Sequence, residues 1–141
     1  MIQEVAVKKL RMNTRQGRAA FRAEVKMLSC IKHSNIVKLI SHHDEGGIVR
    51  IAYEFMPLRS LDLYLYEHEI NKEPLDWQTR MKIAEGVAKA LLYLHDQNEP
   101  PIIYGDLKTS GILLDENFNP KLSDFSFAKL GPTWDCREPG S

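Results

Sequence analysis

The chain has 141 residues, of which 43% are hydrophobic, and its 19 basic side chains balance its 19 acidic ones. This length and apolar content suffice for one domain with a hydrophobic core. No segment approaches the roughly 18 apolar residues of a membrane span, and Met1–Glu4 has neither the apolar run of a signal peptide nor a myristoylation glycine, so we expect a cytoplasmic protein.

The charges are unevenly distributed along the chain. Residues 1–38 contain nine Lys or Arg and two Glu, a balance of +7, and the remainder carries the compensating −7. A basic segment can bind nucleic acid, but no aromatic residues are interleaved here for base stacking. Arg15, Arg18 and Arg22 recur at helical spacing, so we favour a solvated helix face and expect no nucleic-acid partner.

Neither the cysteines nor the histidines indicate a metal centre. Cys30 and Cys136 are too few and too far apart for a disulfide framework or a zinc site, and Cys30 falls in an apolar helical pattern, which predicts a buried thiol. His42 and His43 are adjacent, so on a strand they point in different directions. A metal hydrolase is therefore the less favoured alternative.

The first part of the chain predicts a small antiparallel sheet with one helix packed on it. The predicted elements are a strand at residues 4–10, a connector at 13–17, a helix with Phe21, Val25 and Leu28 on one face, and strands at 36–40 and 48–55. Residues 44–47 contain Gly46 and Gly47 and predict the turn between the last two strands.

The second part predicts two helices and then short apolar segments. Ser60 is a favourable N-cap for a helix to about His68, and Asp76 is one for a longer helix that ends before Pro100-Pro101. The apolar face expected for the longer helix comprises Trp77, Met81, Ala84, Ala88, Leu91 and Leu94. The remaining segments are 102–103, 112–114 and 121–123, with a turn at 115–120. The fold class is α+β.

Two aspartates lie in short apolar frames near the end of the chain. The frames are Tyr104-Gly105-Asp106-Leu107-Lys108 with Gly111-Ile112-Leu113-Leu114-Asp115, and Lys121-Leu122-Ser123-Asp124-Phe125-Ser126. Upstream, Val5-Ala6-Val7-Lys8 reads as a strand that ends on a lysine, and Glu24 lies in the predicted helix. Each residue alone could be an ordinary turn, cap or surface residue, but the four landmarks in this order are much more specific.

The two frames resemble the catalytic loop and the metal-binding turn of protein kinases. The resemblance implies that Asp106 accepts the proton of a substrate hydroxyl, that Lys108 lies near the transferred phosphoryl group, and that Asp124 holds Mg²⁺. It also implies that Lys8, paired with Glu24, contacts the α and β phosphates of ATP.

The similarity extends over residues 4–135. The stretches Phe21-Arg22-Ala23-Glu24-Val25, His33-Ser34-Asn35-Ile36-Val37, Tyr53 to Leu61 and Leu75 to Ala84 resemble the plant receptor-like cytoplasmic kinases of the interleukin-receptor-associated/Pelle group of Ser/Thr kinases. This resemblance implies the following adenine-site residues: Tyr53 as gatekeeper, Glu54, Phe55 and Met56 as hinge, and Ala6 and Leu113 on either side of the ring. Leu28, Tyr104 and Phe125 would belong to a stacked regulatory core.

By the same resemblance the chain is a partial bilobal kinase domain. It would comprise an incomplete N-lobe and hinge at residues 1–56, the first part of a mainly helical C-lobe at 57–135 and a divergent tail at 136–141. The implied ligands are ATP and Mg²⁺. The implied partners are a protein substrate or a receptor kinase in receptor-linked, immune-type signalling, with a location peripheral to the plasma membrane in some family members.

Several departures from the kinase pattern accompany the resemblance. Gly111 stands where kinases place an asparagine that binds a second Mg²⁺, Ser126 replaces the glycine of the Asp-Phe-Gly turn, and Gly105 replaces a common arginine. A left-handed backbone at Ser126 would cost roughly 1 kcal/mol. The sequence also shows no glycine-rich loop before Lys8 and no activation segment after Asp135.

We therefore expect a truncated and catalytically deficient kinase domain. Loss of a metal ligand, a phosphate lid and a substrate platform would each remove on the order of 2–4 kcal/mol of transition-state stabilisation. The alternatives are an active Ser/Thr kinase, a pseudokinase-like interaction module that binds nucleotide weakly, and a truncated product without a function of its own.

Overall fold

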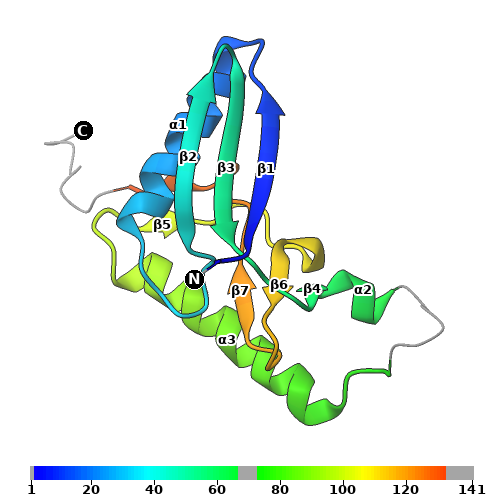
Figure 1. Ribbon diagram of the computed structural model, residues 1–141. Coiled ribbons are helices and arrows are strands. Elements are labelled where there is room, and N and C mark those ends of the chain that lie inside the picture. Colours follow the sequence, from blue (N-terminus) through cyan, green and yellow to red (C-terminus); the bar gives the residue numbers. More distant parts are fainter. Residues whose placement is uncertain (1, 67–72, 133–141) are drawn as a thin grey trace, which may run out of the picture.

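The N-terminal half forms an antiparallel sheet covered by one helix, which confirms the expected α+β arrangement (Figure 1). The structure is a computed structural model that describes residues 2–66 and 73–132. The elements are β1 (Val5–Arg11), α1 (Arg15–Cys30), β2 (Leu39–Glu45) and β3 (Ile48–Glu54), with strand order β1-β3-β2. A cluster of Met12, Phe21, Val49 and Ile51 forms the core between this sheet and α1.

Two glycines connect β2 to β3, in agreement with the predicted turn. Gly46 and Gly47 have φ angles of 59° and 80°, and the strands on either side pair as far as Glu45 and Ile48. Positive φ at both central residues of a two-residue loop is the geometry of a type I′ hairpin turn, which glycine adopts without a steric penalty.

The strand expected at residues 36–40 is present, but its predicted bounds are wrong. The strand β2 begins at Leu39 and continues to Glu45, whereas buried Ile36 forms an isolated parallel bridge with Leu122. The outer residues of β2 are polar and exposed because the strand lies at the edge of the sheet, so the apolar pattern ended before the strand did.

The start of α1 also differs from the expectation. The helix begins at Arg15, inside the predicted connector, because the Thr14 hydroxyl accepts a hydrogen bond from the Gly17 amide at 3.0 Å and caps the first turn. At the other end of the helix Cys30 is exposed, so the prediction of a buried thiol is wrong.

The C-terminal half combines one long helix with short paired strands. It comprises β4 (Arg59–Ser60), α2 (Asp62–Leu65), α3 (Trp77–Asp96), β5 (Ile102–Ile103), a 3₁₀ turn (Thr109–Gly111), β6 (Ile112–Leu114), β7 (Pro120–Leu122) and β8 (Lys129–Leu130). The strands pair as β4-β6-β7 and β5-β8. Ser60 lies in β4 opposite Leu113 and is not the N-cap of α2. The expected end of that helix, His68, lies outside the described residues.

The N-cap of α3 is confirmed, but its buried face is not the expected one. Asp76 accepts a hydrogen bond from the Thr79 amide at 2.7 Å. The buried positions are Ile83, Gly86, Ala90 and Leu94. Of the expected face only Leu94 is buried and Leu91 half-buried, while Trp77 is 71% exposed.

Close approach of the β6–β7 turn explains the position of this face. A Cβ atom on Gly86 would lie 2.4 Å from Cγ of Pro120, so the start of β7 lies directly against α3 at a residue without a side chain. Within the described part of the chain, no helix is long and apolar enough to cross a membrane.

Candidate functional site

A cleft of about 480 Å³ lies between the β1-β3-β2 sheet and the β4-β6-β7 sheet. Eight of the eleven residues with predicted nucleotide-binding, metal-binding or catalytic roles line it: Ala6, Lys8, Tyr53, Glu54, Phe55, Met56, Leu113 and Asp124. They come from β1, from the end of β3 and the segment after it, from β6 and from the segment after β7. Four separate parts of the chain therefore supply the residues that the resemblance had assigned to one nucleotide site.

Two of the other three residues lie close to the lining, and the third reaches it through one of them. Glu24 lies 3.7 Å from Lys8, measured between Oε2 and Nζ. The Nζ atom of Lys108 lies 3.9 Å from Oδ2 of Asp124 and 3.1 Å from Oδ2 of Asp106. The structure thus brings all eleven residues together, while their roles in binding and catalysis stay predictions.

Glu24 is the buried anion of the site, with only 2% of its surface exposed. One carboxylate oxygen faces Lys8, and the other accepts a hydrogen bond from the Tyr53 hydroxyl at 2.8 Å. Burial, followed by the negative charge of Glu24, raises the pKa of Tyr53, which keeps the hydroxyl protonated as a donor at neutral pH. The Tyr53–Glu24 contact was not anticipated, because the two residues are far apart in sequence and the residues around each of them give no sign of the contact.

Asp124 occupies a turn with a left-handed backbone, at φ 56°. Its Oδ1 atom accepts hydrogen bonds from the hydroxyl and, at 3.4 Å, from the amide of Ser126. Burial acts to raise the pKa of Asp124, but the Ser126 hydroxyl, the positive charge of Lys8, the Ser126 amide and Lys108 together hold it below its usual value. The carboxyl group is therefore ionised at neutral pH and available to a cation or to ammonium groups.

Ser126 does not itself adopt a left-handed conformation, since the positive φ at this turn belongs to Asp124. The expected steric penalty at Ser126 is therefore not incurred. The serine instead supplies a hydroxyl that glycine in the kinase pattern cannot supply.

Two aromatic side chains position the segment that carries Asp124. Tyr104 donates a hydrogen bond to the Ser123 carbonyl and packs edge-on against Phe125, with ring centroids 5.1 Å apart. Burial, then the charges of Asp124 and Asp106, raise the pKa of Tyr104 and keep it a donor. Leu28 belongs to the same buried cluster, so the three residues assigned to a regulatory core are all in the protein interior.

Gly105 is required by a close backbone contact. Its φ is +94°, and an added Cβ would lie 2.5 Å from the carbonyl oxygen of Phe127. An arginine in the kinase pattern could not occupy this position without displacement of one of the two segments. Gly105 thus lets the segment after Asp124 lie directly against the loop that carries Asp106.

The described residues offer one side-chain ligand for Mg²⁺ and not the two of the kinase pattern. Gly111 has no side chain to coordinate a metal, and no group of three or more His, Cys, Asp or Glu in the described ranges could hold an ion. One carboxylate together with nucleotide phosphates and waters is a common Mg²⁺ environment. The residues around Asp124 therefore fit a single Mg²⁺ that is shared with a nucleotide.

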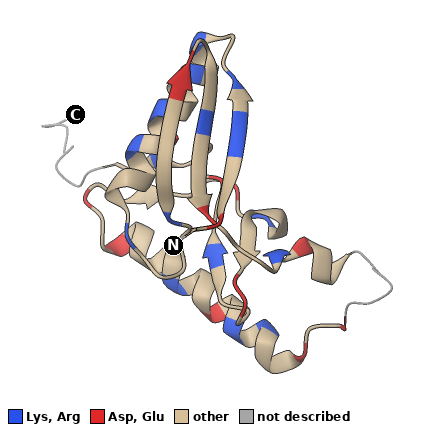
Figure 2. Cartoon of the chain, in the orientation of Figure 1, with Lys and Arg blue, Asp and Glu red and all other residues tan. Residues whose placement is uncertain are grey.

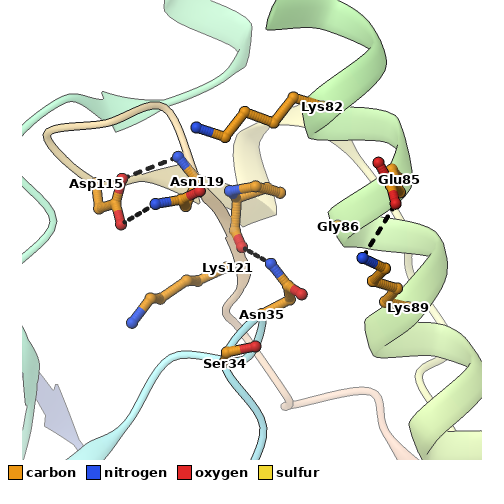
Figure 3. Close-up of a pocket in the computed structure, with 10 residues that line it drawn as sticks. Ser34, Asn35, Lys82, Glu85, Gly86, Lys89, Asp115, Asn119 and Lys121 are labelled. Atoms are coloured by element: carbon orange, nitrogen blue, oxygen red, sulfur yellow. Dashed lines mark hydrogen bonds and ion pairs between the residues drawn. The ribbon is translucent and has the colours of Figure 1, made fainter.

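A second depression, of about 460 Å³, lies between α3 and the β6–β7 turn (Figure 3). Its polar side chains are largely bonded to the chain itself: Lys82 donates to the Asn117 carbonyl at 2.6 Å, and Asn35 donates to the Pro120 carbonyl at 2.9 Å. At the edge of the depression, Lys121 pairs with Glu54 at 2.9 Å. We interpret these bonds as the attachment of the turn to the rest of the fold, because they consume the groups that a ligand would need.

Basic residues of the N-terminal half lie on α1, β1 and β3 (Figure 2). Within residues 1–38, which have the +7 balance, the basic side chains are divided between β1, α1 and the segment after α1. The absence of a nucleic-acid partner stays a prediction.

Comparison with known proteins identifies relatives over nearly the whole chain. The family profile described as protein kinase domain matches residues 2–134. Three Arabidopsis thaliana proteins align over 133 residues, 94% of the chain: serine/threonine-protein kinase PBS1 at 55% identity, probable serine/threonine-protein kinase PBL7 at 53% and serine/threonine-protein kinase CDG1 at 50%. The aligned region covers 29%, 35% and 31% of these relatives, so the chain spans about a third of their length.

Proposed function

The chain belongs to the protein kinase family, and within it to the receptor-like cytoplasmic Ser/Thr kinases of plants. On this basis we propose that it binds ATP in the cleft between the β1-β3-β2 and β4-β6-β7 sheets but transfers the γ-phosphoryl group poorly. The observation that carries the proposal is the convergence of Lys8, Glu24, Asp106, Lys108 and Asp124 around that cleft.

Nucleotide binding follows from the chemistry of the lining. Ala6 and Leu113 supply apolar surface for a planar base, and the backbone from Glu54 to Met56 borders the same space. The ammonium groups of Lys8 and Lys108 lie close to Asp124, where the phosphates would be held. When bound, Mg²⁺ would neutralise phosphate charge, and Asp124 is the residue that would hold it.

Poor transfer follows from positions inside the aligned motifs. Gly111 provides no ligand for a second metal ion, and removal of one preorganised electrostatic group typically costs on the order of 3 kcal/mol of transition-state stabilisation. Asp106 and Lys108 are both retained and lie 3.1 Å apart, so the proposed deficiency rests on the missing metal ligand. We therefore propose weak or absent catalysis together with retained nucleotide binding.

Family membership also supports a role in receptor-linked signalling, with a protein substrate or a receptor kinase as partner. These partners are part of the proposal, since the curated relatives are about three times as long as this chain.

A thermal shift assay tests nucleotide binding directly. ATP with Mg²⁺ is expected to raise the unfolding temperature of the chain, because a ligand that binds only the folded state stabilises it by about 2.7 kcal/mol at 100 times its dissociation constant. Inorganic triphosphate at the same concentration serves as the control and should give a smaller shift, since it lacks the base that Ala6 and Leu113 would contact. A cooperative unfolding transition that neither ligand moves would contradict the proposal.

A further inference from the structure

Both carboxylate oxygens of Asp124 face donors that belong to the chain. Oδ1 accepts from the hydroxyl of Ser126 and from its amide at 3.4 Å. Oδ2 lies 3.9 Å from the ammonium nitrogen of Lys108. Oδ1 is therefore hydrogen-bonded within the chain, whereas Oδ2 faces an ammonium group that lies beyond hydrogen-bond distance.

The hydroxyl is what distinguishes this arrangement from the glycine-containing kinase turn. A glycine at position 126 could offer its amide to Oδ1, but no side-chain donor. A hydrogen bond from a hydroxyl to an ionised carboxylate is roughly twice as strong as one between neutral groups. The serine hydroxyl also fixes the orientation of the Asp124 carboxylate, on a backbone with φ 56° that aspartate adopts more readily than most residues with a side chain.

Mg²⁺ and this hydroxyl would share one carboxylate oxygen. The hydroxyl uses one of the two lone pairs of Oδ1 and withdraws negative charge from it, so Oδ1 becomes a weaker ligand for an ion that needs well-placed oxygens at about 2.0–2.1 Å. Gly111 leaves no second side chain to compensate for a lost carboxylate ligand.

We propose that Ser126 is a positioning residue whose hydrogen bond to Oδ1 weakens Asp124 as a metal ligand, so that nucleotide binding in this cleft depends less on a divalent cation than it would with glycine at position 126. The inference rests on the proposed function, because the cation in question is the one shared with a bound nucleotide. In place of the cation, Lys8 and Lys108 supply much of the positive charge near the phosphates.

The test measures cation binding without any requirement for turnover. Mn²⁺ replaces Mg²⁺ because loss of its free electron paramagnetic resonance signal reports binding, and a non-hydrolysable ATP analogue saturates the full 141-residue chain. Ser126→Ala and Ser126→Gly are expected to bind Mn²⁺ about ten-fold more tightly than wild type, the effect of one hydrogen bond to a charged group. Affinity for the nucleotide in EDTA should stay within about two-fold.

Two variants control for non-specific effects of these changes. Ser126→Thr keeps the hydroxyl and should retain the weak Mn²⁺ binding of wild type. Ser29→Ala removes a hydroxyl that donates to the Val25 carbonyl on an exposed part of α1 and should leave Mn²⁺ affinity unchanged. Circular dichroism of each variant establishes that the comparison concerns folded protein.

The outcomes separate this inference from the proposed function. If the chain binds nucleotide in EDTA but Ser126→Ala does not bind Mn²⁺ more tightly than wild type, the inference alone is overturned. Weaker Mn²⁺ binding in Ser126→Ala would instead make the Ser126 hydroxyl a metal ligand. If folded wild-type chain bound no nucleotide under any condition, the proposed function would be overturned and this inference with it. The inference is supported if Ser126→Ala binds Mn²⁺ more tightly, Ser126→Thr binds it as weakly as wild type does, and the affinity for nucleotide is unchanged in both variants.

Discussion

Substitution of Gly105 by alanine is expected to lower the free energy of unfolding by about 2–4 kcal/mol, and substitution by the arginine of the kinase pattern by at least as much. The backbone at Gly105 has φ +94°, and a Cβ atom there would lie 2.5 Å from the carbonyl oxygen of Phe127. The energetic cost of a left-handed backbone and the cost of the clash with Phe127 therefore add, because both arise from the added Cβ atom. Since a domain of this size is stable by only about 5–15 kcal/mol, urea denaturation should detect the change easily.

Gly46→Ala is the matched control for this prediction. Gly46 also has a positive φ, of 59°, but nothing lies within 4 Å of its missing Cβ, so only backbone strain of roughly 1 kcal/mol is expected. Equal destabilisation by Gly46→Ala and Gly105→Ala would show that the contact with Phe127 contributes nothing. A fully stable Gly105→Arg variant would contradict the close approach of the two segments.

Replacement of Lys8 by methionine is expected to weaken ATP binding about 10- to 100-fold. Lys8 lines the cleft and lies 3.7 Å from Glu24, and one charge-assisted hydrogen bond to phosphate is worth about 1.5–3 kcal/mol. Methionine preserves most of the side-chain length while it removes the charge. Equilibrium dialysis with labelled ATP measures the effect.

Lys9→Met is the matched control for the lysine substitution. Lys9 is the next residue of β1, is exposed, and points to the opposite face because side chains alternate along a strand. It should bind ATP within about two-fold of wild type. Urea denaturation of both variants accompanies the binding assay, because Glu24 loses one of its partners in Lys8→Met. Equal losses of affinity in the two variants would place the phosphates away from Lys8.

Much of the site could be predicted from sequence because its parts are local. The frames around Asp106 and Asp124, the strand with Lys8 and the N-cap at Asp76 are each defined by a few consecutive residues, and the structure places the first three around one cleft. The division into an N-terminal half dominated by strands and a C-terminal half with one long helix follows from the spacing of apolar residues, which changes from a strand period to a helix period along the chain. Short-range patterns are thus sufficient for these features.

The features that sequence reasoning missed depend on contacts between distant segments. The Tyr53–Glu24 hydrogen bond joins residues 29 positions apart, and the parallel bridge of Ile36 requires Leu122. The buried face of α3 is determined by Pro120 against Gly86 and not by the largest apolar side chains of the helix. None of these contacts leaves a signal in the local pattern of either partner.

Ser126 illustrates a different reason for a missed feature. The substitution of a kinase glycine could be read from the sequence, but only as a possible steric penalty. The structure places the positive φ on Asp124 and gives the Ser126 hydroxyl a carboxylate acceptor. The residue therefore affects the electrostatics of the site more than its backbone.

The most direct measurement is transfer of radiolabelled γ-phosphate from ATP in the presence of Mg²⁺, to a general protein substrate and to the chain itself. Asp106→Asn is the reference, because it removes the proposed proton acceptor and preserves the shape of the side chain. We expect wild type and Asp106→Asn to give the same low incorporation although ATP binds. Incorporation by wild type clearly above that of Asp106→Asn would contradict catalytic deficiency and establish an active kinase.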